Sequence, residues 1–219
     1  MQPTLILLSL FGVTQGAVAI PTALLEPPSV GRGIDEQSLR QHYSATEWKA
    51  LEDGAVITAE VGAPQEGKSE QRSVHAAALI AQPPELVWKV LTDFEKRPLF
   101  LPGAKEIRVV RVEGNRVWLD ERAQILLITI NYRVINTLEP ETGVMSWVLD
   151  KEVAHDIADS EGTWRVIALD GGTRTLVTYQ ARIDTGQPVP GFLESFLMKR
   201  SLPQLIEGLR NEVMRRAAQ

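Results

Sequence analysis

The sequence predicts an α+β fold in which a curved antiparallel sheet is covered on one face by a long C-terminal helix. Three observations support this prediction. Segments in which apolar and polar residues alternate follow one another from residue 55 to residue 183. The C-terminal segment instead repeats its apolar residues at helical spacing. Between the second and third predicted strands, a pair of prolines opens a short apolar stripe that is typical of a helix.

Most of the predicted strands are separated by short turns that contain glycine, proline or asparagine. Such connections favour antiparallel neighbours over parallel strands joined by crossover helices. Apolar side chains gather on one face of each strand; Met145, Trp147 and Leu149, for example, lie opposite Ser146 and Asp150. The sheet is therefore one-sided and needs a cover. The predicted strands span residues 55–61, 72–81, 105–112, 115–125, 126–138, 143–151, 162–169 and 173–183.

The segment from Gln82 to Gly103 predicts a helix that ends in an apolar loop. Its two opening prolines suit the first turn of a helix, where an amide hydrogen has no partner. Apolar residues then recur at helical spacing from Val87 to Phe94, and three consecutive apolar residues, Leu99 to Leu101, follow between two further prolines. This loop suits the mouth of an apolar pocket, although the same residues could simply fill a core.

The C-terminal segment from Pro190 onward predicts the helix that covers the sheet. Charged residues occupy the face opposite its apolar stripe, and we interpret that face as solvent-exposed. Pro203 lies within the segment and predicts a kink or a split near Ser201. The stripe consists of Phe192, Leu193, Phe196, Leu197, Leu202, Leu205, Ile206, Leu209 and Val213.

Residues 1–19 predict a signal peptide. The apolar run from Leu5 to Val13 is short for a membrane-spanning helix, and Ala17-Val18-Ala19 follows it as a typical cleavage signature. No Lys or Arg precedes the run, so an uncleaved anchor or a misassigned start of the sequence is the alternative. We expect cleavage near Ala19 and an exported protein, either periplasmic or secreted.

Residues 20–53 predict a linker followed by a short helical extension. Prolines and glycines are frequent in residues 20–33. An apolar stripe between Asp35 and Asp53 predicts helix, and Ser44 with Glu47 forms a candidate capping box, which favours two short helices there. The remaining residues, 54–217, form the predicted folded domain.

The composition excludes several classes of function. The net charge is −5 and no block of Lys or Arg occurs, which argues against nucleic acid as a partner. The absence of cysteine excludes disulfides, thiolate catalysis and cysteine-ligated metals. We find no motif for a nucleophile with its base, a zinc protease or a phosphate-binding loop. His155 lies among acidic residues in the loop from Glu152 to Glu161, where a solvated loop is favoured over a metal site. The sequence therefore predicts no catalytic residue, no metal and no cofactor.

Four strings occur in an order that indicates a known family. They are AQPPELVWKVLTDFEKRPLFLP at Ala81 to Pro102, GTWRV at Gly162 to Val166, GTRTLVTY at Gly172 to Tyr179, and PVPGFL at Pro188 to Leu193. Together they resemble the START-like (SRPBCC) superfamily, in its polyketide cyclase and coenzyme Q-binding branch. The resemblance covers residues 54–217, and Gln82 departs from it by replacing a small residue or proline. It implies a helix-grip fold, with a cavity between the sheet and the last helix for a lipid, quinone, sterol or polyketide-like molecule.

Two interpretations of the function follow. The first is an exported carrier or sensor of a hydrophobic small molecule, with transient membrane contact; predicted export favours it, because lipids must cross an aqueous compartment there. The alternative is a cyclase- or isomerase-like enzyme with Tyr132, Tyr179 or His75 as acid–base groups. A scaffold that binds no small molecule is a weaker third interpretation. We expect Phe100, Leu101 and Phe192 at the mouth of the pocket, and a lining made by Ile128, Ile130, Tyr132, Trp147, Trp164, Tyr179 and Phe196.

Overall fold

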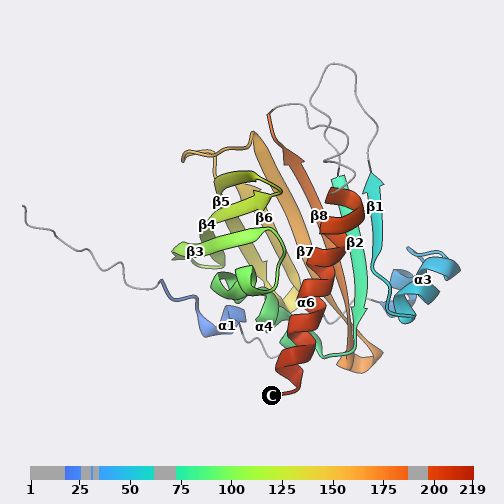
Figure 1. Ribbon diagram of the computed structural model, residues 1–219. Helices are drawn as coiled ribbons and strands as arrows, with labels where there is room; N and C mark the ends of the chain where they lie inside the picture. Colours follow the sequence, from blue (N-terminus) through green and yellow to red (C-terminus); the bar gives the residue numbers. More distant parts are fainter. Residues whose placement is uncertain (1–17, 26–30, 32–34, 62–72, 187–196) are drawn as a thin grey trace, which may run out of the picture.

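The computed structural model describes residues 18–25, 31, 35–61, 73–186 and 197–219. Within these residues one eight-stranded antiparallel sheet has the strand order β1-β2-β8-β7-β6-β5-β4-β3 (Figure 1). Strands β3 to β8 follow one another as a meander, and the β1–β2 hairpin joins the sheet beside β8. This confirms the predicted α+β class. The strands are β1 Ile57–Val61, β2 Ser73–Ile80, β3 Ala104–Glu113, β4 Arg116–Ile125, β5 Ile128–Glu139, β6 Val144–Leu149, β7 Asp159–Leu169 and β8 Arg174–Asp184.

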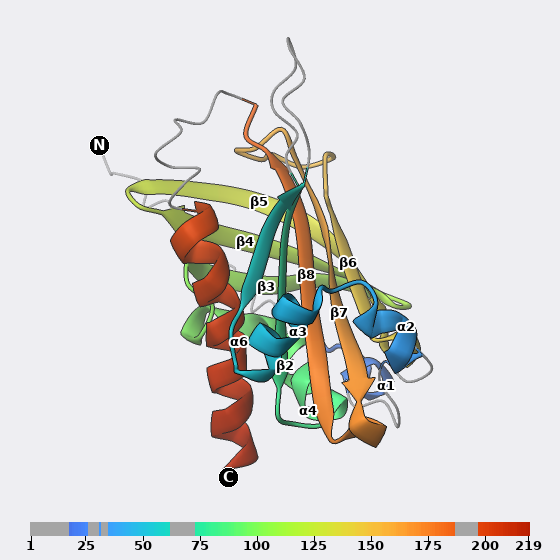
Figure 2. The ribbon, with the colours of Figure 1, turned by 90° about the vertical axis from the view of Figure 1, so that its right-hand side faces the viewer.

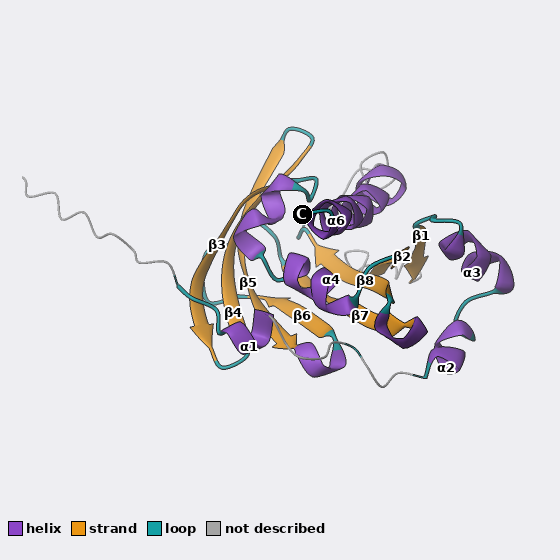
Figure 3. Ribbon diagram, turned by 90° about the horizontal axis from the view of Figure 1, so that it is seen from below, coloured by secondary structure: helices purple, strands orange, loops and turns teal. Residues whose placement is uncertain are grey.

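The sheet curves around two helices, α4 (Pro84–Leu91) and α6 (Leu202–Ala217). Seen from below, the strands form an arc with both helices on its concave side (Figure 3). We call this concave side the inner face and the opposite side the outer face. As the alternation predicted, the strands turn apolar residues inward, but the sheet is not wholly one-sided. Strands β2, β7 and β8 also bury apolar residues on the outer face beneath the N-terminal extension, namely Ala77, Leu79, Ile167, Leu169 and Leu176. The buried cluster on the inner face includes Ala76, Ala78, Val117, Leu119, Val134, Leu138, Met145, Trp164, Val166 and Val177.

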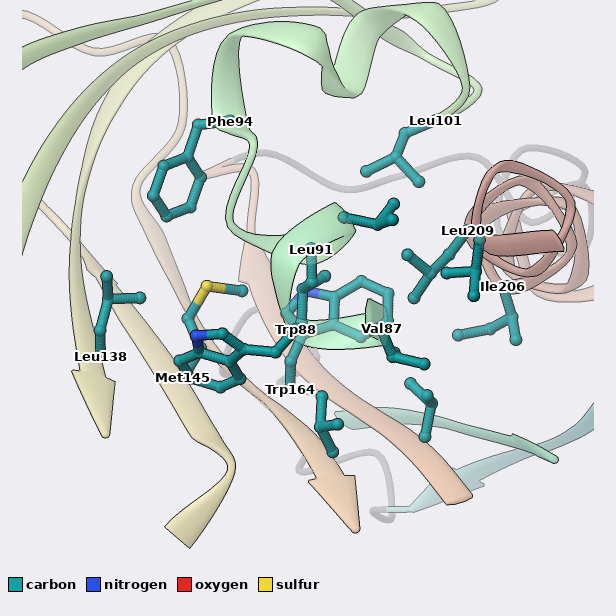
Figure 4. Close-up of a cluster of buried hydrophobic side chains, with 14 of the residues drawn as sticks. Val87, Trp88, Leu91, Phe94, Leu101, Leu138, Met145, Trp164, Ile206 and Leu209 are labelled. Atoms are coloured by element: carbon teal, nitrogen blue, oxygen red, sulfur yellow. The ribbon is translucent and has the colours of Figure 1, made fainter. Parts of the chain in front are cut away.

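The core lies where α4 enters between the sheet and α6. Pro84 occupies the first turn of α4. Just after the helix, the Thr92 hydroxyl donates a hydrogen bond to the Trp88 carbonyl oxygen at 2.8 Å. In Figure 4, Trp88 and Leu91 lie between Met145 and Trp164 on the sheet side and the α6 side chains on the other side. Burial of each large apolar side chain of this kind stabilises the fold by about 1.5–3 kcal/mol. The short helix therefore anchors both layers to one another.

Helix α6 closes the inner face. Its buried residues are Leu202, Ile206, Leu209 and Val213, which belong to the predicted stripe. A π-helical turn, η4 (Leu197–Ser201), precedes α6, and Pro203 lies in the first turn of the α-helix. The predicted irregularity near Ser201 is confirmed. Among the helices that the structure describes, none has both the length and the apolar character needed to cross a bilayer.

The N-terminal extension packs on the domain from two sides (Figure 1 and Figure 2). Helices α2 (Glu36–Arg40) and α3 (Ala45–Glu52) lie beside the outer face, and the predicted capping box of Ser44 and Glu47 is present at the start of α3. Helix α1 (Thr22–Leu25) lies within residues 20–33, which the sequence analysis predicted to be a linker. There Leu24 packs against the main core, and its carbonyl oxygen accepts a hydrogen bond from Trp88 Nε1 at 2.7 Å.

The β4–β5 hairpin ends in an unusual turn. The sequence prediction put the strand boundary between Ile125 and Leu126, inside a continuous apolar run. The structure pairs Ile125 with Ile128 and leaves Leu126 and Leu127 as a two-residue turn. Leu126 has a φ of 54°, a left-handed conformation in which glycine is usual. Both strands are thus present as predicted; β4 ends at Ile125 as expected, and β5 begins two residues later than expected, at Ile128.

Candidate functional site

The inner face is closed at one end and partly open at the other. Strand β5 shows this gradient, because its inward-facing residues pass from Leu138, Asn136 and Val134, which are buried, to Tyr132 and Ile130, which are half-buried. Ile128, next to the hairpin turn, is 54% exposed. The inner face therefore becomes accessible toward the β4–β5 hairpin. This end of the inner face is the candidate ligand-binding site.

A carboxylate lies on this otherwise apolar surface. Glu121 of β4 faces inward, in register with Tyr132 of β5, and the Tyr132 hydroxyl donates a hydrogen bond to Glu121 Oε2 at 2.9 Å. Burial raises the pKa of Glu121 above its ordinary value of 4.5, while the positive charge of Arg97 and the Tyr132 hydrogen bond act in the opposite direction. A carboxyl group with a raised pKa inside a fold is a candidate proton donor or acceptor.

Arg97 supplies a buried cation beside this carboxylate. It is 6% exposed, and its Nε and one terminal nitrogen donate to the Leu91 carbonyl oxygen at 2.8 and 2.6 Å. The same terminal nitrogen lies 3.3 Å from Met145 Sδ, and the guanidinium carbon lies 4.4 Å from the centre of the Phe94 ring. Burial lowers the pKa of Arg97 to about 10, so the group remains charged at neutral pH. These contacts fix a positive charge within the core.

Three aromatic residues form the wall next to the charged groups. The rings of Trp147 and Tyr179 are stacked with centres 5.6 Å apart, and the rings of Trp164 and Tyr179 are tilted with centres 4.6 Å apart. Trp147 Nε1 donates to Ser160 Oγ at 3.2 Å. Gly162 leaves room for this arrangement, because a Cβ there would lie 2.2 Å from the Trp147 ring. The glycine of the GTWRV string thus permits the tryptophan to lie flat against β7.

The two tyrosines of the site are neutral and can donate hydrogen bonds through their hydroxyl groups. Burial and then the negative charge of Glu121 raise the pKa of Tyr132 well above 10, and the same two causes raise the pKa of Tyr179. Both phenols therefore keep their protons at neutral pH. Asn136, 2% exposed, lies deeper on the same face, and its Nδ2 is one of the buried donors that have no hydrogen-bond partner among the described residues. The site offers donors rather than bases, apart from Glu121.

The structure places most of the predicted lining on this face. Tyr132, Trp147, Trp164 and Tyr179 all border the inner-face core, and Ile130 continues the row toward the hairpin. Of the predicted mouth residues, Leu101 is buried in the core and Phe100 packs against it. Ile128 is exposed at the hairpin end. Phe192 and Phe196 lie outside the described residues.

Two surface hollows lie on the outer face of the sheet. One, of about 400 Å³, is bordered by Arg108, Asp120, Asn131 and Arg133, and it also touches Glu121 and Tyr132, whose side chains face inward. Its charged side chains are already paired with one another, Asp120 with Arg133 at 2.6 Å and with Arg108 at 3.0 Å, and Arg122 with Glu106 at 3.0 Å. The other, of about 300 Å³, lies between the α2–α3 connection, α3 and the sheet, and it includes His75. His75 therefore faces away from the inner side, and it is not an acid–base group for a ligand bound there.

Sequence reasoning missed both charged groups of the site. Glu121 alternates with Val117 and Leu119, so a carboxylate on an apolar strand face was the available signal. Arg97 lies in a charged stretch with Asp93, Glu95 and Lys96, where ion pairs among neighbours are the ordinary expectation. The structure pairs Asp93 with Lys96 at 3.2 Å and with Arg216 at 2.9 Å. Glu95 accepts a hydrogen bond from the Val109 amide, which leaves Arg97 to turn inward.

Comparison with solved structures shows the same fold in proteins of low sequence identity. An aromatase/cyclase, ZhuI, from Streptomyces sp. R1128 matches with a TM-score of 0.58 and 18% identity over 68% of this chain and 96% of that chain. A STAR-related lipid transfer protein from Xanthomonas axonopodis matches with a TM-score of 0.59 and 15% identity over 73% and 94%. Human STARD10 matches with a TM-score of 0.60 and 14% identity over 89% and 85%. These likenesses show the fold alone.

A family model adds evidence from the sequence itself. The model described as polyketide cyclase/dehydrase and lipid transport matches residues 80–210, which include α4, η1, strands β3 to β8 and half of α6. No curated protein matches the sequence. The family match and the helix-grip architecture agree with one another, and both agree with the predicted resemblance. The chain belongs to the polyketide cyclase/dehydrase and lipid transport family, within the START-like superfamily of helix-grip proteins.

Proposed function

We propose that this protein binds and carries an amphipathic hydrophobic molecule between the inner face of the sheet and α6. The observation that carries the proposal is a combination at Glu121, Tyr132 and Tyr179. Each faces inward on the concave side of the sheet, yet each is only half-buried, so part of its surface remains accessible. Such a combination is expected for the wall of an enclosed cavity and not for a close-packed core.

The chemistry of this wall favours a ligand with an apolar body and one polar end. Trp147, Trp164 and Tyr179 present aromatic surface, which suits rings and alkyl chains. Arg97 and the Tyr179 hydroxyl, by contrast, can orient a carbonyl, hydroxyl or carboxylate deep within the cavity. Lipids, quinones, sterols and polyketide-like molecules all have this construction. The relatives described as a lipid transfer protein and as an aromatase/cyclase support the same range.

Ile130→Trp tests the cavity. Ile130 is half-buried on the inner face between Ile128 and Tyr132, so a larger ring at this position enters the proposed cavity. We expect little change in the free energy of unfolding and a loss of uptake of a fluorescent fatty-acid analogue. The matched control is Val148→Trp on the outer face of β6, where the side chain is 49% exposed. Destabilisation of Ile130→Trp by about 1–3 kcal/mol with unchanged uptake would indicate a packed core and refute the proposal.

A second candidate function is a cyclase- or isomerase-like enzyme, and Glu121 is the observation that favours it. Its raised pKa and its hydrogen bond to Tyr132 suit general acid–base chemistry on a molecule held against the wall. Glu121→Gln separates the two functions. If the protein is a carrier, Glu121→Gln should still release the same molecule as the wild type on extraction with solvent. If the protein is an enzyme, Glu121→Gln should instead accumulate a precursor that the wild-type protein converts, and mass spectrometry would detect that precursor.

We further propose that the protein is exported. The support is the apolar run from Leu5 to Val13 followed by Ala17-Val18-Ala19. N-terminal sequencing of the native protein should give a start near Ile20. A cytoplasmic protein that retains Met1 would contradict this.

A further inference from the structure

The N-terminal extension builds a second core on the outer face of the sheet. Trp48 and Leu51 of α3 pack there against Leu79, Ile167 and Leu176 of the strands. Figure 2 looks onto this face, with α2 and α3 in front of the strands. Beside the second core, the α2–α3 connection leaves the hollow of about 300 Å³, a volume at the lower end of the range for small-molecule sites. We call it the outer hollow.

One wall of the outer hollow comes from a part of the chain that lies outside the family match. His42, Tyr43 and Glu47 border the hollow from the extension, whereas the family model matches residues 80–210. Its floor consists of outward-facing residues of β1, β2, β7 and β8. The proposed ligand of the inner face touches none of these side chains, so the hollow needs an explanation of its own.

The floor changes in character from one side to the other. The β1 side is apolar, and the half-buried ring of Tyr43 continues this apolar surface, because it packs against the second core. The side formed by β7 and β8 presents hydroxyl, amide and guanidinium groups. The outer hollow is thus amphipathic, with the cation of Arg165 on its polar side. Two rows of residues cross the floor in register, namely Ala59, His75, Gln180 and Thr163, and then Ile57, Ala77, Thr178 and Arg165.

The polar side chains of this floor have no partners within the part of the chain that the structure describes. Arg165, Gln180 and His75 form no side-chain hydrogen bond or ion pair with those residues. The next outward arginine on β8, Arg182, is by contrast paired with Glu161 at 3.1 Å. Arg165 is therefore an exposed cation whose donors are free, at the edge of a preformed hollow.

The carboxylate that borders the outer hollow, Glu47, is already engaged. Its Oε2 accepts hydrogen bonds from the Ser44 amide at 2.8 Å and from the Ser44 hydroxyl at 2.7 Å, which hold it in the capping box of α3. Glu47 and Arg165 form no ion pair with one another, so the guanidinium keeps its donors for a ligand. A carboxylate suits these donors, because a guanidinium binds a carboxylate through two parallel hydrogen bonds.

From these observations we propose that the outer hollow is a second binding site, which takes a small organic carboxylate. The carboxylate group binds Arg165 and the neighbouring donors of Gln180 and Thr178, and the apolar body of the molecule lies against Tyr43 and Ala77. Inorganic phosphate shares the anionic chemistry and has no apolar body, so it should bind more weakly. This site is independent of the function proposed for the inner face.

The test is fluorine NMR of the full chain with para-fluorobenzoate, and with para-fluorobenzyl alcohol as the matched neutral molecule. We expect para-fluorobenzoate to bind and the alcohol to bind about tenfold more weakly or less. Arg165 is exposed, so Arg165→Gln should keep the fold, and it should weaken para-fluorobenzoate binding by about tenfold or more. Arg108→Gln, at the other hollow, removes an arginine whose side chain is 55% exposed; it is the control and should bind as the wild type does.

Ile130→Trp locates the molecule, because it alters the inner face and leaves the outer hollow unchanged. Binding of para-fluorobenzoate should therefore be the same in Ile130→Trp as in the wild type. Loss of binding in Ile130→Trp, or unchanged binding in Arg165→Gln, would overturn the proposal. So would absence of binding at millimolar concentration, or equal affinity for the alcohol or for inorganic phosphate. Uptake of the fluorescent fatty-acid analogue by Arg165→Gln should equal that of the wild type, and it reports separately on the proposed function.

Discussion

Gly208→Ala gives a direct measure of how tightly α6 closes the inner face. In the interior of a helix, alanine is ordinarily favoured over glycine by about 0.5–1 kcal/mol. Here a Cβ at residue 208 would lie 2.1 Å from the Phe100 carbonyl oxygen and 3.2 Å from its carbonyl carbon. Both atoms belong to backbone and cannot rotate away, so α6 and the loop after η1 must separate by roughly 1 Å. Overpacking of this kind costs about 1–3 kcal/mol, and we expect a net destabilisation of about 1–2 kcal/mol.

Urea denaturation followed by tryptophan fluorescence measures this effect, since Trp88 and Trp164 lie in the core beneath α6. The matched control is Asn211→Ala, an exposed position on the same helix. Alanine there should stabilise the protein by up to about 0.5 kcal/mol. If Gly208→Ala stabilises the protein as much as Asn211→Ala does, then α6 does not pack against the loop as described and the reasoning is refuted.

Three further predictions concern charge and packing. Because the folded protein raises the pKa of Glu121, wild-type stability should fall as pH rises above 4.5, and Glu121→Gln should lack this fall; parallel urea midpoints across pH would contradict it. Hydrogen bonds from Arg215 and then Arg216 lower the pKa of Glu212 to about 2, so its contribution is present above 4.5 and lost toward pH 2. Glu212→Gln should therefore cost about 0.5–1 kcal/mol at neutral pH, after allowance for solvent screening, and nothing near pH 2. Gly162→Ala should displace the Trp147 ring, lowering thermal stability and changing near-ultraviolet circular dichroism; an unchanged spectrum would be the opposing result.

Much of the fold was predictable because alternation and turn chemistry act locally. The strands, the proline-initiated helix α4 and the capping box at Ser44 all follow from residues a few positions apart. The β4–β5 turn was harder to place, because Leu126 and Leu127 contradict the residue preferences of hairpin turns. The packing of Leu24 on Trp88 could not be predicted either, since it joins residues 64 positions apart.

The candidate site was predictable as a face and not as a chemical environment. Period-two alternation places Tyr132, Trp147 and Tyr179 on one side of the sheet, and the structure brings them to the same wall. Arg97 points inward because Asp93 and Glu95 interact with other residues. Asp93 pairs with Arg216 of α6, and Glu95 accepts a hydrogen bond from the Val109 amide of β3. The pattern of apolar and polar residues in the sequence is also the same for a packed core and for a wall that lines a cavity. Accessibility at Glu121 required three-dimensional information.

The central claim is that the inner face holds a hydrophobic molecule, and the most direct measurement is the identification of that molecule. The native protein is purified from its own cells and extracted with organic solvent, and the extract is analysed by mass spectrometry beside that of Ile130→Trp. We predict one class of amphipathic molecule in stoichiometric amount from the wild type and its absence from the variant. An extract that contains no such molecule, from a protein that also fails to take up the fluorescent fatty-acid analogue, would contradict the claim.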